Sequence, residues 1–188
     1  MAEKINIGKN FSLYPMPVTL VGTTVAGKPN FMAVGWVSRV NFKPPIVGIA
    51  IHKGHYTPNG IQENKSFSIN IPGADLVLQT DYCGIVSGRK VDKSAVFDIF
   101  YGETQNVPMI RQCPICAECS LYQVLEMPTN NFYLGEVVAT YTEDRYLTDG
   151  KPDIEKMKPF VLTMTDNRYW RIGDFLENAW SCGKKLKT

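Results

Sequence analysis

The polar run His52–Thr57 (HKGHYT) stands between an apolar, strand-like stretch and a stretch that reads as a helix. A strand that leads into a helix N-terminus presents free N–H groups and the positive end of the helix dipole, and both favour a phosphate. Lys53 adds a positive charge, and the hydroxyls of Tyr56 and Thr57 add hydrogen-bond donors. We therefore predict an anion site at this junction. The alternative is an ordinary helix cap beside a solvated lysine.

The segment Met32–Val37 (MAVGWV) alternates small residues with bulky ones. Small side chains let a flat ligand approach the backbone closely, and backbone amides can then hydrogen-bond to the edge of that ligand. Packing within a barrel strand would explain the same pattern. Ser38 follows directly and could bring another hydroxyl to the predicted anion site.

The loop Cys83–Lys90 is rich in small and basic residues. Gly84, Ser87 and Gly88 could line a ligand, while Arg89 or Lys90 could meet an anionic group. An ordinary connection between two elements is the alternative, because a lone Ser-Gly pair in a loop is weak support for a site.

Three cysteines, Cys113, Cys116 and Cys119, are evenly spaced and invite a metal interpretation. A closed zinc site needs four ligands, and both histidines of the chain lie far away in sequence. On a strand, Cys116 and Cys119 would face opposite sides. We predict no metal site. A redox pair of Cys113 and Cys116 is a further alternative, although it lacks the helix N-terminus that usually lowers a thiol pKa.

Familiar catalytic signatures are missing from the sequence. It contains no P-loop, no G-x-G-x-x-G motif and no nucleophile elbow, and its two histidines make a hydrolytic triad improbable. We therefore assign no catalytic side chain and expect a cofactor to supply the chemistry.

Composition narrows the class of protein. The chain has 20 Lys and Arg against 18 Asp and Glu, a balance that gives no reason to expect nucleic acid as a partner. No signal peptide and no membrane-length apolar run appears, and five cysteines, an odd number, suit reduced thiols. We expect a cytoplasmic protein without a membrane partner, and 188 residues fit one domain over 1–188.

The elements that must position these residues are mainly strands. β-Branched or alternating runs predict strands, and Thr57 as N-cap with Pro58 at the first helical position predicts a helix start. The first three strands, with a Pro44-Pro45 corner between the last two, predict an antiparallel meander. The expected strands are residues 18–25, 31–40, 46–51, 66–71, 117–126, 131–142 and 159–164, and the expected helices are residues 57–64, 74–84 and 91–100.

Three segments in order, NFMAVGWVSRVNFKPPIVGIAI, HKGHYTPNGIQENKSFSINI and TDYCGIVSGRKVDK, resemble the flavin reductase-like, FMN-binding split-barrel family, in particular its flavoredoxin and ferric reductase branch. The resemblance is strong over residues 13–97 and weaker through Glu118-Cys119 and residues 159–173. It implies a mainly β fold with added helices, built as a six-stranded antiparallel split β-barrel. It also implies a homodimer with FMN near the subunit interface.

The resemblance further implies which residues hold FMN. Residues 32–36 would run along the isoalloxazine ring. The phosphate would be held by Ser38, Lys53, Tyr56 and Thr57, and the ring or ribityl chain would be flanked by Cys83, Gly84, Ser87 and Gly88. His55 stands where relatives often place an arginine. The implied set is Asn30, Met32, Ala33, Val34, Gly35, Trp36, Ser38, Lys53, His55, Tyr56, Thr57, Cys83, Gly84, Ser87 and Gly88.

These implications lead to an FMN-binding oxidoreductase that uses NADH or NADPH to reduce free flavin, ferric iron or a redox protein partner. One alternative is an FMN electron carrier that a protein partner reduces in place of NAD(P)H. Another is a split barrel that binds flavin or haem without catalysis. The aromatic-rich residues 168–183 predict a packed or interface surface, and whether they complete a neighbouring subunit's site stays open.

Overall fold

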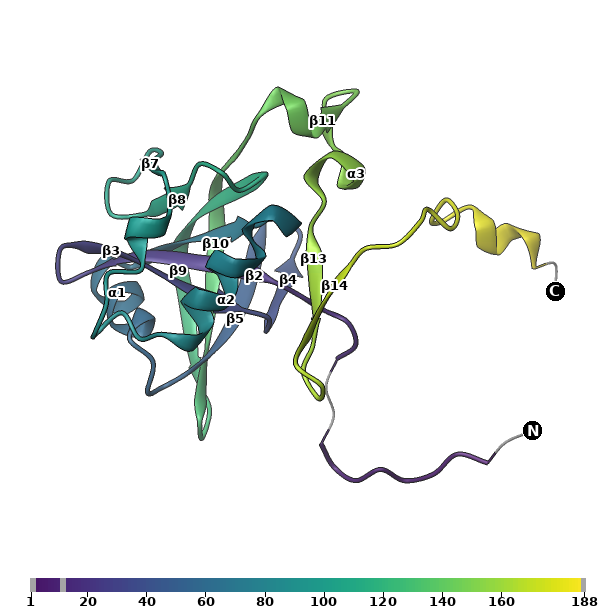
Figure 1. Cartoon of the computed structure of the whole chain (residues 1–188), viewed down its shortest axis with the longest axis horizontal. Coiled ribbons are helices and arrows are strands. Elements are labelled where there is room, and N and C mark those ends of the chain that lie inside the picture. The colour runs from purple at the N-terminus through teal and green to yellow at the C-terminus, as the bar shows by residue number, and fades with distance from the viewer. Residues whose placement is uncertain (1–2, 11–12, 187–188) are drawn as a thin grey trace.

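The computed structural model describes residues 3–10 and 13–186 (Figure 1). Its strands are β1 (Met16–Pro17), β2 (Thr19–Val25), β3 (Lys28–Val34), β4 (Val37–Asn41), β5 (Ile46–His52), β6 (Ser66–Ile71), β7 (Ile99–Tyr101), β8 (Pro108–Ile110), β9 (Ile115–Glu126), β10 (Asn130–Thr142), β11 (Leu147–Thr148), β12 (Lys151–Pro152), β13 (Phe160–Thr163) and β14 (Arg168–Arg171). Its α-helices are α1 (Thr57–Asn64), α2 (Val77–Ile85) and α3 (Ile154–Met157). Short 3-10 turns are η1 (Ala74–Leu76), η2 (Ser94–Val96), η3 (Asp144–Tyr146) and η4 (Cys182–Lys185).

The main sheet is antiparallel and has seven strands in the order β3-β2-β6-β9-β10-β5-β4. Its two end strands, β3 and β4, are consecutive in the chain and are separated only by Gly35 and Trp36. The sheet therefore curls until its edges meet. Within this link the carbonyl of Trp36 accepts a hydrogen bond from the backbone N–H of Ala50 in β5 at 2.9 Å, which extends the pairing of β4 with β5.

The predictions of six strands and of a single strand over residues 31–40 are wrong. Residues 28–34 pair with β2, whereas residues 37–41 pair with β5, so the run changes partner at the barrel corner. The predicted antiparallel meander is also wrong between its second and third strands, because β3 and β5 are not neighbours in the sheet.

Two hydrophobic clusters fill the two faces of the sheet. One combines side chains from β2, β5, β6, β9 and β10, and the other lies beneath α2 and β8. Leu20 and Val21 of β2 belong to different clusters, as the alternation of a strand requires. Cys116 and Cys119 also divide between the two clusters, so the prediction that they face opposite sides is confirmed.

Helix α1 has the bounds that the sequence predicts, and it packs against β2. The contact is close: a Cβ on Gly60 would lie 2.4 Å from the carbonyl oxygen of Thr24. The predicted helix over residues 74–84 is the turn η1 followed by α2, which packs against β3.

The predicted helix over residues 91–100 is wrong. The Asp92 carboxylate accepts hydrogen bonds from the backbone N–H and the hydroxyl of Ser94, and only the short turn η2 follows. Phe97 is extended, and the chain continues into β7, which pairs with β8. Local capping by an aspartate and long-range strand pairing therefore replace the helix.

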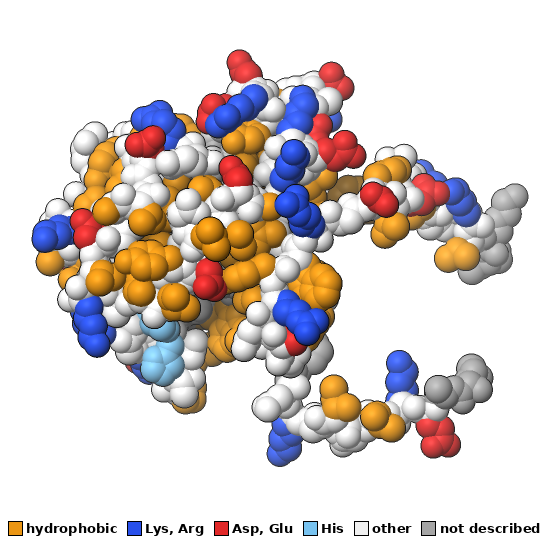
Figure 2. Space-filling model, viewed as in Figure 1, with side chains coloured by type: hydrophobic (Ala, Val, Ile, Leu, Met, Phe, Trp, Pro, Cys, Tyr) orange, Lys and Arg blue, Asp and Glu red, His pale blue; other side chains and the backbone are white. Residues whose placement is uncertain are grey.

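A small outer sheet, β1-β13-β14, stands beside the barrel and confirms the strand expected at residues 159–164. Two arms extend from this side of the molecule: residues 3–10 with 13–15, and residues 172–186 (Figure 1). Figure 2 shows exposed hydrophobic side chains along both arms. Among the described helices, none has the length and apolar character needed to cross a membrane.

Candidate functional site

An apolar cleft of about 270 Å³ lies at the corner where β3 passes into β4. One wall comes from the barrel, and the other comes from the outer sheet, where Met16 of β1 lies opposite Leu162 of β13. Trp36 stands at the mouth and is 51% exposed. The lining residues are Met16, Met32, Ala33, Val34, Gly35, Trp36, Ala50, Ile51, His52, His55, Asn130, Leu162 and Met164.

A polar cleft of about 160 Å³ adjoins the apolar cleft, because Met32 and His55 line both. It lies between the start of α1 and the loop that follows α2. Its lining residues are Met32, Gly54, His55, Tyr56, Thr57, Cys83, Gly84, Ile85, Val86, Ser87, Gly88, Arg89 and Lys93. In Figure 2 the two histidines, in pale blue, border a patch of hydrophobic side chains at this end of the barrel.

The structure brings most of the sequence-predicted residues together. Met32, Ala33, Val34, Gly35 and Trp36 line the apolar cleft. A second group, His55, Tyr56, Thr57, Cys83, Gly84, Ser87 and Gly88, lines the polar cleft. Segments separated by about 50 residues in the sequence therefore form one continuous site, whose role in binding FMN stays a prediction.

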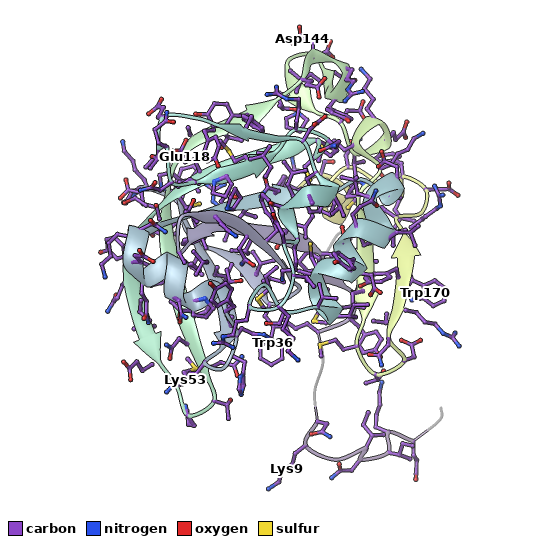
Figure 3. All side chains as sticks on the ribbon, turned by 60° about the vertical axis from the view of Figure 1, so that its left-hand side comes forward. Lys9, Trp36, Lys53, Glu118, Asp144 and Trp170 are labelled. Carbon is purple, nitrogen blue, oxygen red and sulfur yellow. The ribbon has the colours of Figure 1, made fainter. Side chains whose placement is uncertain are left out.

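Ser38 and Lys53 line neither cleft. Ser38 pairs with Gly48, four residues before the end of β5, which places it roughly 13 Å along the strand from His52. Its hydroxyl donates to the Arg39 carbonyl instead. Lys53 is exposed (Figure 3). Its backbone N–H donates to the carbonyl of Thr129. Their proposed contacts with a phosphate stay predictions.

The start of α1 differs from the predicted cap. Tyr56 occupies the N-cap position without a side-chain cap, so Thr57 is the first helical residue and the predicted N-cap is wrong. The buried hydroxyl of Thr57 accepts a hydrogen bond from the Asn30 amide nitrogen at 2.9 Å. This hydrogen bond joins β3 to the first residue of α1.

Asn30 has one unsatisfied atom. The residue is 4% exposed, and its amide oxygen is buried without a hydrogen-bond partner among the described residues. Gly88 lies directly against it, because a Cβ on Gly88 would be 2.1 Å from that oxygen. A buried carbonyl oxygen of this kind costs free energy unless a donor reaches it.

Lys93 is the main residue that sequence reasoning missed. It is only 5% exposed, and its ammonium donates to the carbonyls of Cys83 (3.1 Å) and Val86 (3.3 Å). Within the described part of the chain it forms no salt bridge with a carboxylate. Burial lowers the pKa of Lys93. No local pattern marks this lysine, because its burial depends on packing between the loop and α2.

Arg89 joins the two halves of the polar cleft. Its guanidinium donates to the Gly54 carbonyl at 3.0 Å and lies 5.4 Å from the centre of the Tyr56 ring. Gly54 in turn donates its N–H to Nδ1 of His52 at 3.0 Å. The loop after α2 is thereby tied to the junction before α1.

The electrostatics of the polar cleft favour a neutral His55. Burial lowers the pKa of His55, and the neighbouring His52, Lys93 and Arg89 lower it further. Burial raises the pKa of the Cys83 thiol to about 11, although Lys93 opposes the shift. At neutral pH the cleft therefore presents an uncharged imidazole and a protonated thiol beside Arg89 and Lys93.

The thiols of Cys113, Cys116 and Cys119 are buried in the core. Burial raises the pKa of Cys113 well above its usual value and raises those of Cys116 and Cys119 to about 12. The Cys116 thiol donates to the Ile110 carbonyl at 3.2 Å. Such thiols resist ionisation, which disfavours the alternative of a reactive Cys113–Cys116 pair. In the part of the chain that the structure describes, no three His, Cys, Asp or Glu residues are arranged to hold a metal ion.

The model of the flavin reductase like domain matches residues 11–171, so the chain belongs to the flavin reductase-like family. The expected family is confirmed, and the fold is that of the split-barrel members.

Two solved structures that resemble this chain are called flavoredoxins. The chain is 55% identical to a flavoredoxin from Methanosarcina acetivorans, with a TM-score of 0.97 over 99% of this chain and 100% of that one. It is 32% identical to the flavoredoxin of Desulfovibrio vulgaris (Miyazaki F), with a TM-score of 0.91 over 96% and 100% of the two chains. An uncharacterised protein of Archaeoglobus fulgidus is 31% identical over 76% of this chain and 80% of its own length.

Proposed function

We propose that the chain is an oxidoreductase that binds FMN across the two adjoining clefts. The isoalloxazine ring would occupy the apolar cleft, and the ribityl phosphate would occupy the polar cleft. The observation that carries this proposal is the buried ammonium of Lys93, which has no carboxylate partner among the described residues and lines the polar cleft. A buried cation without a counter-ion is stabilised when an anionic ligand joins it.

The residues fit a flavin in three respects. An apolar wall of Met32, Leu162 and Met164 suits a flat ring, and the small residues of β3 allow close approach of the backbone. Asn30, whose buried oxygen lacks a donor, lies against Gly88 of the polar cleft and offers an acceptor for a ligand hydroxyl there. The hydroxyls of Tyr56, Thr57 and Ser87 suit a ribityl phosphate.

When bound, a flavin would supply the hydride and single-electron chemistry that side chains cannot. The chain's own residues would position it. Trp36 and the outer sheet would limit the access of water to the ring, while Lys93 and Arg89 would offset the phosphate charge. His55, neutral at the junction of the clefts, would contribute hydrogen bonds without adding charge.

The source of electrons separates two candidate functions. A reductase would accept hydride from NADH or NADPH and pass electrons to free flavin, ferric iron or a redox protein. An electron carrier would be reduced by a protein partner. Similarity to two proteins called flavoredoxins supports the carrier as the second candidate.

One anaerobic experiment tests both candidates. The purified protein is loaded with FMN, freed of excess flavin, and mixed with NADH or NADPH while the flavin absorption is followed. Rapid bleaching supports the reductase, whereas bleaching that requires a reduced ferredoxin-type protein supports the carrier. A protein that retains no FMN would contradict the proposal. The absence of bleaching with both NADH and NADPH would rule out the reductase.

We further propose a homodimer in the cytoplasm. The arm at residues 172–186 carries Phe175, Leu176 and Trp180, which are 72%, 90% and 96% exposed in the single chain. Apolar side chains exposed in such a series are typical of an interface, and a second copy of the chain offers equally exposed apolar surface. All five cysteines are free thiols, in keeping with a reducing compartment.

A further inference from the structure

The second wall of the apolar cleft belongs to a sheet that does not pair with the barrel. The outer sheet and the seven-stranded sheet share no strand. β1 offers only the pairs Met16–Leu162 and Pro17–Val161, and Pro17 has no backbone N–H to donate. The hairpin of β13 and β14 (residues 160–171), which we call the outer hairpin, therefore stands beside the barrel with little main-chain pairing to restrain it (Figure 1).

One end of the outer hairpin is fixed to the rest of the protein through its main chain. Gly73 forms an isolated antiparallel bridge with Pro159, and the N–H of Ala74 donates to the carbonyl of Lys158 at 2.9 Å. Both contacts lie immediately before β13. Met164, which lines the apolar cleft, follows β13 at its other end. A movement of the hairpin would therefore hinge at residues 158–159 and displace the cleft wall most at Met164.

One side-chain hydrogen bond joins the outer hairpin to α2. The Tyr169 hydroxyl donates to a carboxylate oxygen of Asp81 at 2.8 Å, between residues 88 positions apart in the chain. Within the described ranges, no other side-chain hydrogen bond and no salt bridge connects the hairpin to the rest of the protein. Burial, together with the neighbouring Asp81 carboxylate, raises the pKa of Tyr169 to about 12, so the hydroxyl remains a donor at neutral pH.

The Tyr169 side chain lies in the same row as the residues of the wall. In the register of the outer sheet, Met16 lies opposite Leu162, and Leu162 lies opposite Tyr169. Directly opposite residues of antiparallel strands share one face of the sheet, so these three side chains face the barrel together. Asp81 lies two residues before Cys83, which lines the polar cleft. The hydrogen bond therefore ties the wall of the apolar cleft to the helix that borders the polar cleft.

We propose that the outer hairpin is a hinged wall of the apolar cleft and that the Tyr169–Asp81 hydrogen bond holds this wall closed. A flat ring in the cleft would have the barrel on one face and this wall on the other. The wall is the less restrained of the two, so its opening sets how fast the ring enters and leaves. Tyr169 and Asp81 act through the wall and are positioning residues. The inference rests on the proposed function in taking FMN as the ligand.

The test measures how fast FMN exchanges in Tyr169→Phe, in Asp81→Ala and in the double variant. Tyr122→Phe is the control, because it removes an exposed tyrosine hydroxyl that lines neither cleft. Stopped-flow fluorescence after mixing flavin-free protein with FMN gives the association rate constant, and dilution of loaded protein gives the dissociation rate constant. Neither measurement depends on an electron donor.

We expect both rate constants to rise about fivefold in each single variant, because loss of one hydrogen bond raises the open fraction of the hairpin by about that factor. The Kd for FMN should stay within about twofold, since entry and release accelerate equally. The double variant should match the single variants, because all three lack the same bond. A damaged fold or a lost ligand contact would weaken binding without accelerating association.

Two results would overturn the inference: unchanged rate constants in Tyr169→Phe, or faster dissociation without faster association. The proposed function fails separately, if the unmodified protein binds no FMN. In that event hydrogen exchange of the flavin-free protein decides the inference. The amides of residues 160–163 should exchange about fivefold faster in Tyr169→Phe while those of β6 keep their protection, and equal exchange at residues 160–163 would refute the hinged wall.

Discussion

At the scale of single residues, the proposed function gives the phosphate contact to Lys93 rather than to Lys53. Replacing Lys93 by Met should weaken FMN binding by about 1.5–3 kcal/mol, because a partly desolvated, charge-assisted contact is lost. The matched change Lys53→Met should cost less than about 1 kcal/mol, since that ammonium is solvated. Fluorescence titration of flavin-free protein measures both. A larger loss for Lys53→Met would restore the assignment made from the sequence.

The lowered pKa of His55 predicts how the stability of the flavin-free protein depends on pH. Its pKa in the folded state lies below the ordinary value of 6.5, so the unfolded chain takes up the proton first as the pH falls. The free energy of unfolding should therefore decrease as the pH falls from 6.5 to below the pKa that His55 has in the folded state. Urea unfolding at pH 7.5 and 5.5 should show a smaller decrease for His55→Gln than for the unmodified protein. Equal decreases would contradict this role.

At the scale of elements, the contact between α1 and β2 depends on Gly60. Ala at this position should raise helix propensity, but its Cβ would meet the Thr24 carbonyl at 2.4 Å. We expect Gly60→Ala to lower the free energy of unfolding by about 1–3 kcal/mol and to weaken FMN binding, because α1 begins at the polar cleft. Asn59→Ala, at an exposed position of the same helix, is the control. A stabilised Gly60→Ala protein would show that propensity outweighs the contact.

Glu118 of β9 holds the loop that follows β7 in place by hydrogen bonds. Its fully buried carboxylate accepts hydrogen bonds from the backbone N–H groups of Glu103 (3.1 Å) and Thr104 (2.6 Å) and from the hydroxyl of Tyr141 (3.2 Å). Glu118→Gln keeps the shape but replaces one acceptor oxygen by a donor group. We expect a loss of about 1–3 kcal/mol in unfolding experiments.

Hydrogen exchange supplies a second measurement for Glu118→Gln. The amides of Glu103 and Thr104 should exchange faster in the variant, while the amides of α1 should keep their protection. Unchanged exchange at Glu103 and Thr104 would show that the carboxylate does not hold the loop.

At the scale of the whole molecule, the arm at residues 172–186 should hold the proposed dimer together. Deleting the chain from residue 172 removes Trp180 and its apolar neighbours without removing any strand of the barrel. Light scattering after size exclusion should find a dimer for the full chain and mainly monomer for the truncated one at micromolar concentration. A truncated protein that remains dimeric would place the interface elsewhere, and a monomeric full chain would contradict the dimer.

The sequence by itself determined the elements whose causes are local. The bounds of α1 and β6 follow from turn residues and alternation within a few positions, and most of the predicted cofactor residues line one of the two clefts. Lys93, Ala50, Asn130 and the outer sheet were not among them. The tertiary structure decided the rest. The change of partner at Gly35-Trp36, the burial of Lys93 and the wall formed by Leu162 and Met164 each depend on contacts between segments far apart in the chain. Local pattern carries no information about such contacts, because they arise only when the barrel closes.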